Sequence, residues 1–386
     1  ACLAAGINAE VIDPEEAKRM EPSVNPSLIG AVKVPDGSVD PFRLCASNVF
    51  DAKIHGAKVL VYSEVIEFIK EQDTIKGVKV LDHHTGIVTD YYAPVTVNAG
   101  GIWGHHIAQM AGANISMFPA KGALLIFAHR VNSVVINRCR KPANADILVP
   151  GDTVCVIGTT STRVPYEECD HLKVTPDEVD LLLTEGAKLA PCLAETRVLR
   201  AYAGVRPLVS ADNDPSGRNI SRGIVCLDHE TRDGIKGFIS ITGGKLMTYR
   251  LMGEMAADAV CKKLGRDAKC VTADTPLPGS EPGGIEEISK KIWEVPTMVQ
   301  KASVGRFGTQ AANLDFDGDV KGSLVCECEE VSVSEVDSAI ENLEVNNLVD
   351  LRRRTRFGMG TCQGELCACR AAGRLAKARK CTAKAR

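Results

Sequence analysis

The chain has 386 residues, and its 46 lysines and arginines nearly balance its 49 aspartates and glutamates, which leaves a net charge of −3. This balance excludes a strongly basic nucleic-acid-binding protein, and no apolar run is long enough to span a bilayer. No signal peptide is recognisable. The length allows two or three domains with sizeable cores, and any membrane association is expected to be peripheral.

The first third of the chain alternates helix and strand signals. A helix is predicted over residues 41–54, because a proline follows the turn at 36–40 and a glycine follows the helix end. Strands are predicted at 59–62, 65–69, 77–81 and 91–97, with a hairpin turn at 83–86. The last strand leads into Gly100 and Gly101 and a helix at 103–110. Glycines at a strand end allow close approach of a nucleotide, although a tight strand–helix junction explains them equally well.

Residues 113–210 change to strands with a single helix. Strand signals occur at 123–127, 134–136, 146–149, 154–158 and 197–205, and the helix signal at 176–189, a composition typical of an antiparallel sheet. Strands at 224–227 and 238–241 return to the first region. Two interleaved parts are therefore expected, 37–112 with 211–265 and 1–36 with 113–210. Residues 275–321 are interpreted as a linker with a short helix, before a small cysteine-rich domain at 322–386.

The paired glycines Gly243 and Gly244 form the most distinctive candidate ligand turn. A predicted strand runs into them, and a helix-compatible segment continues to residue 264. Glycines let a ligand approach the backbone, a helix start favours an anion, and Lys245 adds a positive charge. Arg206 and Arg222 could join Lys245 around a dianionic phosphate, since guanidinium groups grip oxyanions bidentately. The alternative is that all three are surface charges balanced by nearby aspartates.

The fifteen cysteines are unevenly spread, with six between residues 326 and 381 and nine scattered singly. Scattered thiols indicate a reducing compartment, so a cytosolic protein is expected, and the C-terminal group indicates a metal site. Two close pairs form its centre, Cys326 with Cys328 and Cys362 with Cys367. Four thiolates suit either a [2Fe–2S] cluster or zinc, and the cluster is favoured because Cys-x-Cys is less usual for zinc. Cys369 is either a spare thiol or an alternative ligand, and the arginines at 352–354 could offset the thiolate charge.

Four segments together carry a resemblance to a known family. Residues 30–43, 97–104, 204–208 and 243–250 resemble FAD-dependent glycerol-3-phosphate dehydrogenases, and the C-terminal cysteine pattern resembles the bacterioferritin-associated-ferredoxin-like [2Fe–2S] domain. The combination is similar to the large A subunits of the anaerobic bacterial enzymes. The resemblance implies a mixed α/β chain with a D-amino-acid-oxidase-like FAD domain (37–112 and 211–265). It is interleaved with an antiparallel β substrate domain (1–36 and 113–210) and followed by a small helical cysteine-rich domain.

The resemblance also implies roles for individual residues. Arg206 and Arg222 would hold a substrate phosphate, and Lys245 would lie at the junction of flavin and substrate; these three are the candidate catalytic residues. The cluster ligands would be Cys326, Cys328, Cys362 and Cys367. The residues expected to line FAD are Val65, Gly100, Gly101, Gly243, Gly244, Leu246, Met247 and Thr248.

The implied activity is oxidation of sn-glycerol 3-phosphate to dihydroxyacetone phosphate. Electrons would pass through FAD and the [2Fe–2S] cluster to flavin-containing and iron–sulfur membrane-anchor subunits and then to quinone, at the inner face of the cell membrane. The alternatives are an FAD-dependent oxidoreductase for another 2-hydroxy or amino acid, and a non-enzymatic iron–sulfur module that binds a partner. No G-x-G-x-x-G motif occurs, and the chain opens on Ala-Cys-Leu rather than Met. We therefore expect a fragment that binds FAD weakly or not at all.

Overall fold

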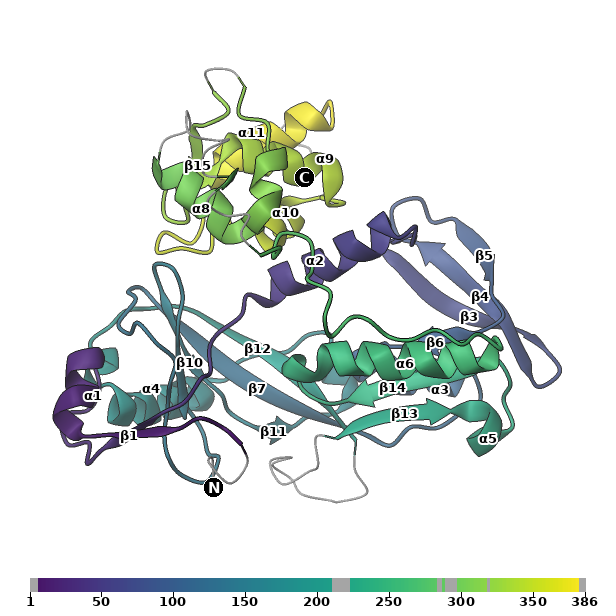
Figure 1. Cartoon of the computed structure of the whole chain (residues 1–386), viewed down its shortest axis with the longest axis horizontal. Coiled ribbons are helices and arrows are strands. Elements are labelled where there is room, and N and C mark those ends of the chain that lie inside the picture. Colours follow the sequence, from purple (N-terminus) through teal and green to yellow (C-terminus); the bar gives the residue numbers. More distant parts are fainter. Residues whose placement is uncertain (1–5, 210–222, 283–286, 289–296, 318–319, 382–386) are drawn as a thin grey trace.

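The structure, a computed structural model, describes residues 6–209, 223–282, 287–288, 297–317 and 320–381. Figure 1 shows a six-stranded sheet at one end, a three-stranded sheet lined by a long helix beside it, and a separate hairpin layer at the far end. A C-terminal group of short helices lies above helix α2. The mixed α/β class predicted from the sequence is confirmed.

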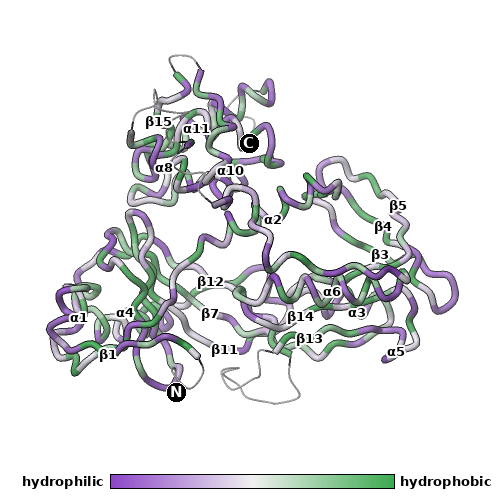
Figure 2. The backbone as a smooth tube through the Cα atoms, in the orientation of Figure 1, coloured by the Kyte–Doolittle hydropathy of each residue, from purple (hydrophilic) through white to green (hydrophobic). Residues whose placement is uncertain are grey.

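The six-stranded sheet is antiparallel throughout, as predicted. Its central strand β7 (Met117–Phe127) pairs along its whole length with β12 (Val198–Val209). On its other edge β7 pairs with β11 (Thr162–Arg163) and β10 (Cys155–Gly158), and the sheet continues through β9 (Ile147–Pro150) to β8 (Ile136–Asn137). Helix α4 (Pro176–Leu189) starts at a capping box of Thr175 and Glu178 and packs on β7 and β10. Figure 2 shows apolar segments gathered in this region, where the largest core of the sheet lies.

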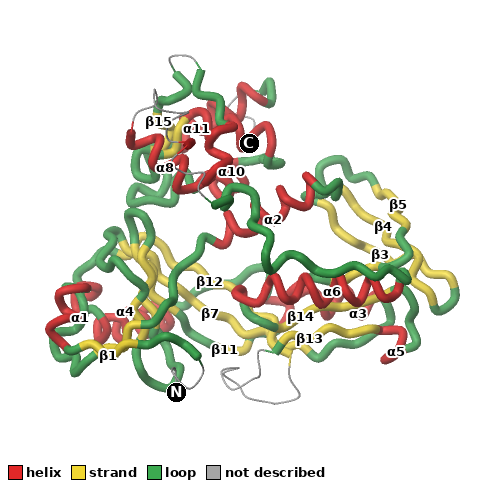
Figure 3. Tube along the Cα trace, in the orientation of Figure 1, coloured by secondary structure: helices red, strands yellow, loops and turns green. Residues whose placement is uncertain are grey.

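The second sheet brings together strands from distant parts of the chain. Strand β14 (Phe238–Gly243) pairs antiparallel with β13 (Ile224–Asp228) and parallel with β6 (Thr96–Asn98). The short helix α5 (His229–Asp233) connects β13 and β14, and α3 (Gly104–Met110) follows β6 through the turn η2 (Gly101–Trp103). Figure 3 shows helix α6 (Tyr249–Lys263) lying along β13 and β14. The hairpin layer consists of β3 (Ser63–Glu71), β4 (Thr74–Asp82) and β5 (Val88–Tyr92).

The first 60 residues supply a small two-stranded sheet and two helices. Strands β1 (Glu10–Ile12) and β2 (Ala31–Lys33) pair antiparallel and flank α1 (Pro14–Met20). Helix α2 (Pro41–Ile54) occupies the range predicted for it, with Asp40 as its N-cap and Pro41 in its first turn.

Three sequence predictions for local structure are wrong. The single strand predicted at 91–97 is divided between β5 and β6, which belong to different sheets, because the chain leaves the hairpin layer at 93–95. The strand predicted at 59–62 is not formed, because Tyr62 has a left-handed φ of +53° that an extended strand does not allow. The helix expected from Gly244 begins only at Tyr249, since Gly243 and Gly244 have φ values of +78° and +70° and a short turn η5 (Leu246–Thr248) intervenes.

The C-terminal unit, residues 297–381, is built from short helices around its own core. Its elements are α8 (Thr297–Phe307), η6 (Gly308–Asn313), β15 (Leu324–Cys326), β16 (Val331–Ser332), α9 (Val333–Asn342), α10 (Leu348–Thr355) and α11 (Ala368–Ala378). Glu335 completes a capping box with Ser332 and is closed to solvent, where Arg306 of α8 pairs with it at 2.7 Å. Helix α8, which belongs to the expected linker range, is thereby tied to this unit.

No helix in the described part of the chain combines the length and the hydropathy of a membrane-spanning segment.

Candidate functional site

The Gly243–Gly244 turn can be formed only by glycines. Both residues have positive φ, and a Cβ on Gly243 would stand 2.4 Å from the carbonyl oxygen of Gly223. A Cβ on Gly244 would stand 2.7 Å from Thr248 Oγ1 and 2.8 Å from Met252 Sδ. The chain therefore reverses here without side-chain bulk, which is the property that a close-approaching ligand requires.

The residues after this turn present their side chains to solvent. The Lys245 N–H donates to Thr248 Oγ1 at 3.0 Å, and that hydroxyl donates back to the Lys245 carbonyl at 2.8 Å. This local bond fixes the backbone and leaves Leu246 and Met247 exposed, at 49% and 75%. Lys245 is also exposed, and within the described residues it forms no ion pair with a carboxylate.

The Gly100–Gly101 turn is held from below by a buried amide. Asn98 accepts the N–H of Gly100 at 3.1 Å and donates to the Gly104 carbonyl at 2.8 Å. A Cβ on Gly100 would stand 2.5 Å from the Ile107 side chain, whereas one on Gly101, where φ is +57°, would meet no atom within 4 Å. The backbone at Gly101 therefore faces open space, which fits a bound cofactor.

A buried chain of hydrogen bonds continues from Asn98 across the sheet. The Asn98 amide donates to Ser240 Oγ at 3.1 Å, Ser240 Oγ lies 2.8 Å from His229 Nε2, and His229 Nδ1 lies 2.5 Å from Asp233. His229 is completely buried and stacks on Phe238 with ring centroids 4.6 Å apart. Ser240 is also buried, so its hydroxyl cannot act as a nucleophile on a substrate. The hydrogen-bonded series of Asp233, His229 and Ser240 instead supports the glycine turn. It was not predicted from the sequence, where the i, i+4 spacing of His229 and Asp233 is its one local signal.

Ser240→Ala is expected to destabilise the chain by about 1–3 kcal/mol, because it leaves buried groups of Asn98 and His229 without their partner. Chemical denaturation followed by circular dichroism measures this change. Ser27→Ala is the control, since Ser27 is exposed and its substitution should change the unfolding free energy by less than about 0.5 kcal/mol. Equal stabilities of the two variants would contradict the supporting role.

Arg206 lies on β12, a strand that contacts the elements carrying these turns. Its backbone pairs with Ala120 on β7, and its Nη2 donates to Thr159 Oγ1 at 2.5 Å. The guanidinium lies over Gly122, where an added Cβ would stand 2.6 Å from Nη2. Val205, the preceding residue, packs in the same small cluster as Ile102 of η2. Strand β12 contacts both η2 and β14, so the two glycine turns and the arginine strand belong to neighbouring elements.

The remaining predicted residues of this region lie elsewhere. Arg222 falls outside the described residues. Val65 is half-buried on β3, opposite Val80 in the hairpin layer rather than in the sheet that carries the glycine turns. Lys121, which precedes Gly122, is buried and pairs with Glu178 at 2.9 Å, so its charge is already neutralised by a structural partner.

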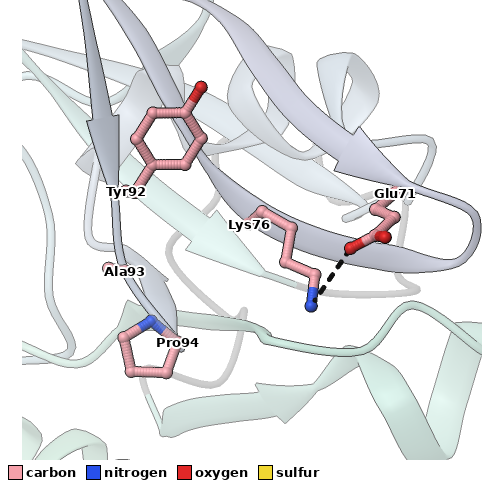
Figure 4. Close-up of a pocket in the computed structure, with 5 residues that line it drawn as sticks. All are labelled: Glu71, Lys76, Tyr92, Ala93 and Pro94. Atoms are coloured by element: carbon pink, nitrogen blue, oxygen red, sulfur yellow. Dashed lines mark ion pairs between the residues drawn. The ribbon is translucent and has the colours of Figure 1, made fainter.

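A large open hollow on the hairpin layer is not this site. It has a volume of about 510 Å³ and is lined by Glu71, Lys76, Tyr92, Ala93 and Pro94, as Figure 4 shows. Its charged groups already pair with each other, Lys76 Nζ lying 3.4 Å from Glu71. None of the predicted site residues lines it, and we assign it no role.

The four predicted cysteine ligands come together in the C-terminal unit. Cys326 and Cys362 both act electrostatically on Cys367, and the same two thiols act on Cys328. Among the described residues no three His, Cys, Asp or Glu side chains have the geometry of a single metal-ion site. A zinc ion takes its ligands around one centre, whereas a [2Fe–2S] cluster takes two thiolates on each iron. Four neighbouring thiols supply the number of ligands that a [2Fe–2S] cluster needs.

The backbone around Cys362 favours a thiolate. Burial alone would raise the pKa of Cys362, but the N–H groups of Leu366, Gly364 and Glu365 together lower it. Burial raises the pKa of Cys367 to about 12, which favours the neutral thiol when no metal is bound. Amide donors aimed at sulfur are a feature that stabilises a negatively charged cluster.

Arg352 and Cys369 lie near the four cysteines, and each can be given a role. Among the arginines at 352–354, the charge of Arg352 acts on Cys367, so Arg352 can offset cluster charge. Cys369 is exposed on α11, whereas Cys367 is buried. Cys369 is thus separated from the two pairs by its exposure, and we treat it as a spare thiol.

Known proteins resemble this chain over nearly its whole length. Residues 1–250 match the family described as FAD dependent oxidoreductase, and residues 324–375 match the BFD-like [2Fe-2S] binding domain. The A subunit of the anaerobic glycerol-3-phosphate dehydrogenase of Haemophilus influenzae is 61% identical over 372 residues, which cover 96% of this chain and 66% of that protein. Its counterpart in Escherichia coli K12 is 61% identical over 375 residues, covering 97% and 69%. The chain belongs to this family of A subunits.

The family assignment confirms the family resemblance seen in the sequence. It also confirms the two predicted cofactor-binding domains, one for FAD and one for [2Fe–2S]. The chain spans about two thirds of the length of these relatives. Among solved structures, a Bacillus halodurans glycerol-3-phosphate dehydrogenase complexed with FAD matches with a TM-score of 0.73 at 21% identity, covering 97% of this chain and 78% of that one. A glycine oxidase from Geobacillus kaustophilus matches at 0.53 and 20%, covering 72% and 68%. At these identities the two structures show the fold.

Proposed function

We propose that the chain belongs to an enzyme that oxidises sn-glycerol 3-phosphate to dihydroxyacetone phosphate. The observation that carries the proposal is the position of Arg206. It lies on β12, which contacts the elements that carry the glycine turns, and its guanidinium lies over Gly122 of β7. A guanidinium at that position suits a phosphate group, and the glycine turns suit a flavin next to it.

Each residue of this site has a proposed task. Arg206, with Arg222, would bind the phosphate and so orient the C2–H bond of the substrate. Lys245 would lie at the junction of substrate and flavin, where its positive charge favours the negative charge that develops there. The glycine turns at 100–101 and 243–244, with Leu246, Met247 and Thr248, would line FAD, and Val65 would contact its adenine end. Bound FAD supplies the hydride acceptor.

The cysteine pairs supply the second half of the proposal. Cys326, Cys328, Cys362 and Cys367 would together hold the [2Fe–2S] cluster, which supplies one-electron transfer when bound. Electrons from the flavin would leave through this cluster to partner subunits and finally to quinone, with the chain peripheral on the inner face of the membrane. The names of the relatives, which are A subunits, support the existence of such partners.

Substrate turnover tests the proposal directly. The FAD-reconstituted protein is assayed with a dye acceptor on sn-glycerol 3-phosphate, lactate and glycine, at equal concentrations. Turnover of the phosphorylated substrate alone is expected. Turnover of lactate or glycine, without use of sn-glycerol 3-phosphate, favours the alternative oxidoreductase, and a cluster spectrum without any flavin band favours a non-enzymatic module.

Gly122→Ala is expected to raise KM for sn-glycerol 3-phosphate about tenfold, because the new methyl group displaces the Arg206 guanidinium. Gly204→Ala is a matched control. Gly204 faces Gly122 in the β7–β12 ladder, and an added Cβ there meets no atom within 4 Å. Steady-state kinetics of both variants check the prediction. Equal KM values for the two would show that Arg206 is not positioned by Gly122.

A further inference from the structure

One side chain at the start of α2 serves two parts of the protein at once. The Oδ1 of Asp40 caps α2 by accepting the N–H groups of Phe42 at 2.9 Å and Arg43 at 3.3 Å. Its Oδ2 accepts Nη1 of Arg356, in the C-terminal unit, at 2.8 Å. The two oxygens therefore divide the tasks of helix capping and contact between the units.

Arg356 forms ion pairs with three carboxylates from different parts of the chain. It ends α10 with a left-handed φ of +69°, and its Nε donates to Glu329 at 2.8 Å. The same nitrogen lies 3.4 Å from Asp152, in the turn at 151–154 between β9 and β10. The side chains of Arg356 and Asp40 are less than one-fifth exposed, and that of Glu329 is closed to solvent. Burial lowers the pKa of Arg356, but Glu329 and Asp40 outweigh it and raise that pKa.

Glu329 connects this pair to the cysteine site. It follows Cys328 directly in the chain, and its backbone carbonyl accepts Nη1 of Arg306 at 2.7 Å. A Cβ on Gly360 would stand 2.5 Å from the Cβ of Cys328, 3.0 Å from Thr153 Oγ1 and 3.1 Å from Glu329 Oε1. Only a glycine at 360 thus lets Cys328 approach the turn at 151–154, and this edge of the cysteine site faces the six-stranded sheet unit.

Further contacts join the units along α2 and just after it. Lys53 pairs with Glu344 at 2.5 Å, and the Tyr62 hydroxyl donates to Asp350 at 2.8 Å. A cleft of about 140 Å³ remains between α2 and the segment 342–344, so packing there is incomplete. Figure 1 shows the C-terminal unit meeting the rest of the protein along α2. Because packing between the two units is incomplete, directional polar contacts set the orientation of the C-terminal unit relative to the rest of the protein.

We propose that Asp40 and Arg356 are a positioning pair that orients the cysteine site, with its Cys328 edge against the turn at 151–154. The electron-transfer consequence rests on the proposed function, whereas the orientation itself does not. A buried ion pair contributes little net stability but discriminates strongly between orientations, since separating it leaves a charge buried without its partner. The two residues act through the position of the cluster domain and do not touch substrate.

Asp40→Asn is the sharpest test, because asparagine caps a helix about as well as aspartate but carries no charge. In the cluster-loaded protein we expect unchanged iron content, because Asp40 does not contact the cysteines. Amide hydrogen exchange at 151–154 and 342–347 is expected to become about tenfold faster, because the units separate more often. Reduction of the cluster by sn-glycerol 3-phosphate, followed by stopped flow, is expected to slow about tenfold, while flavin reduction keeps its rate.

The matched control is Asp13→Asn, the same substitution at the N-cap of α1, whose side chain accepts the Glu16 N–H at 2.9 Å. It should leave both readouts unchanged. In a protein that already carries Arg356→Gln, Asp40→Asn should add nothing, since the pair is already broken. Exchange rates in Asp40→Asn equal to those of the native protein overturn the positioning pair. Faster exchange in a protein that does not oxidise sn-glycerol 3-phosphate leaves the pair standing and overturns the proposed function.

Discussion

Arg206→Ala is expected to raise KM for sn-glycerol 3-phosphate about a hundredfold while the protein remains folded. Hydrogen bonds to charged groups contribute about 1.5–3 kcal/mol each, and a guanidinium offers two of them to one phosphate. Arg206 is on a long, fully paired strand, so loss of its side chain removes no backbone bond. Steady-state kinetics with a dye acceptor measure the change, and inhibition by inorganic phosphate should weaken in parallel.

Two further variants separate charge from geometry at this position. Arg206→Lys keeps the charge as a point donor and is expected to recover part of the loss, because lysine cannot bind two phosphate oxygens in the same planar fashion. Arg197→Ala removes an exposed arginine just before β12 and should leave KM unchanged. If Arg206→Ala and Arg197→Ala show the native KM, the phosphate is bound elsewhere.

Cys362→Ser is expected to abolish stable binding of the [2Fe–2S] cluster. The Cys362 sulfur is paired with that of Cys328 and lies among N–H donors that lower its pKa, and a serine hydroxyl offers neither thiolate nor soft sulfur to iron. Cys362 is only half-buried, so the substitution should leave the apolar core of the C-terminal unit in place. Iron content and visible absorption after anaerobic purification should fall by at least about tenfold.

Cys369→Ser is the matched control for the cluster. Cys369 is exposed on the following helix and should be dispensable, so this variant is expected to retain iron and spectrum. Loss of iron in Cys369→Ser but not in Cys362→Ser would falsify the ligand assignment. Zinc in place of iron in the native protein, with no visible band, would show that the two thiol pairs close around a single ion.

Local chemistry already predicts a large part of this fold. Helix α2 begins where Asp40 and Pro41 provide a cap and a preset φ, and β14 ends where Gly243 and Gly244 permit a positive φ. The antiparallel sheet around β7 follows from short strands separated by turns. The cysteine spacing was enough to predict a C-terminal [2Fe–2S] domain, which the family match over residues 324–375 confirms.

Contacts between distant residues could not be predicted in this way. Tyr62 belongs to an apolar, strand-like run, but it takes a left-handed conformation and its hydroxyl donates to Asp350 in another unit. Cys367 meets Cys326, 41 residues earlier in the chain, because the return of the chain before α11 brings the two thiols together.

The sequence alone was therefore sufficient for most of the elements, the family and the two cofactors. Only the folded chain reveals the support behind the Gly100–Gly101 turn and the orientation of the cluster domain. Ser240 reaches Asn98 across 142 residues, and Arg356 reaches Asp40 across 316. A glycine turn or a helix cap is determined by a few adjacent residues and can be predicted from them. A buried hydrogen bond between remote side chains produces no periodic pattern or fixed spacing in the sequence, so it cannot be predicted in this way. Such bonds arise when packing excludes water and leaves each polar group a single partner.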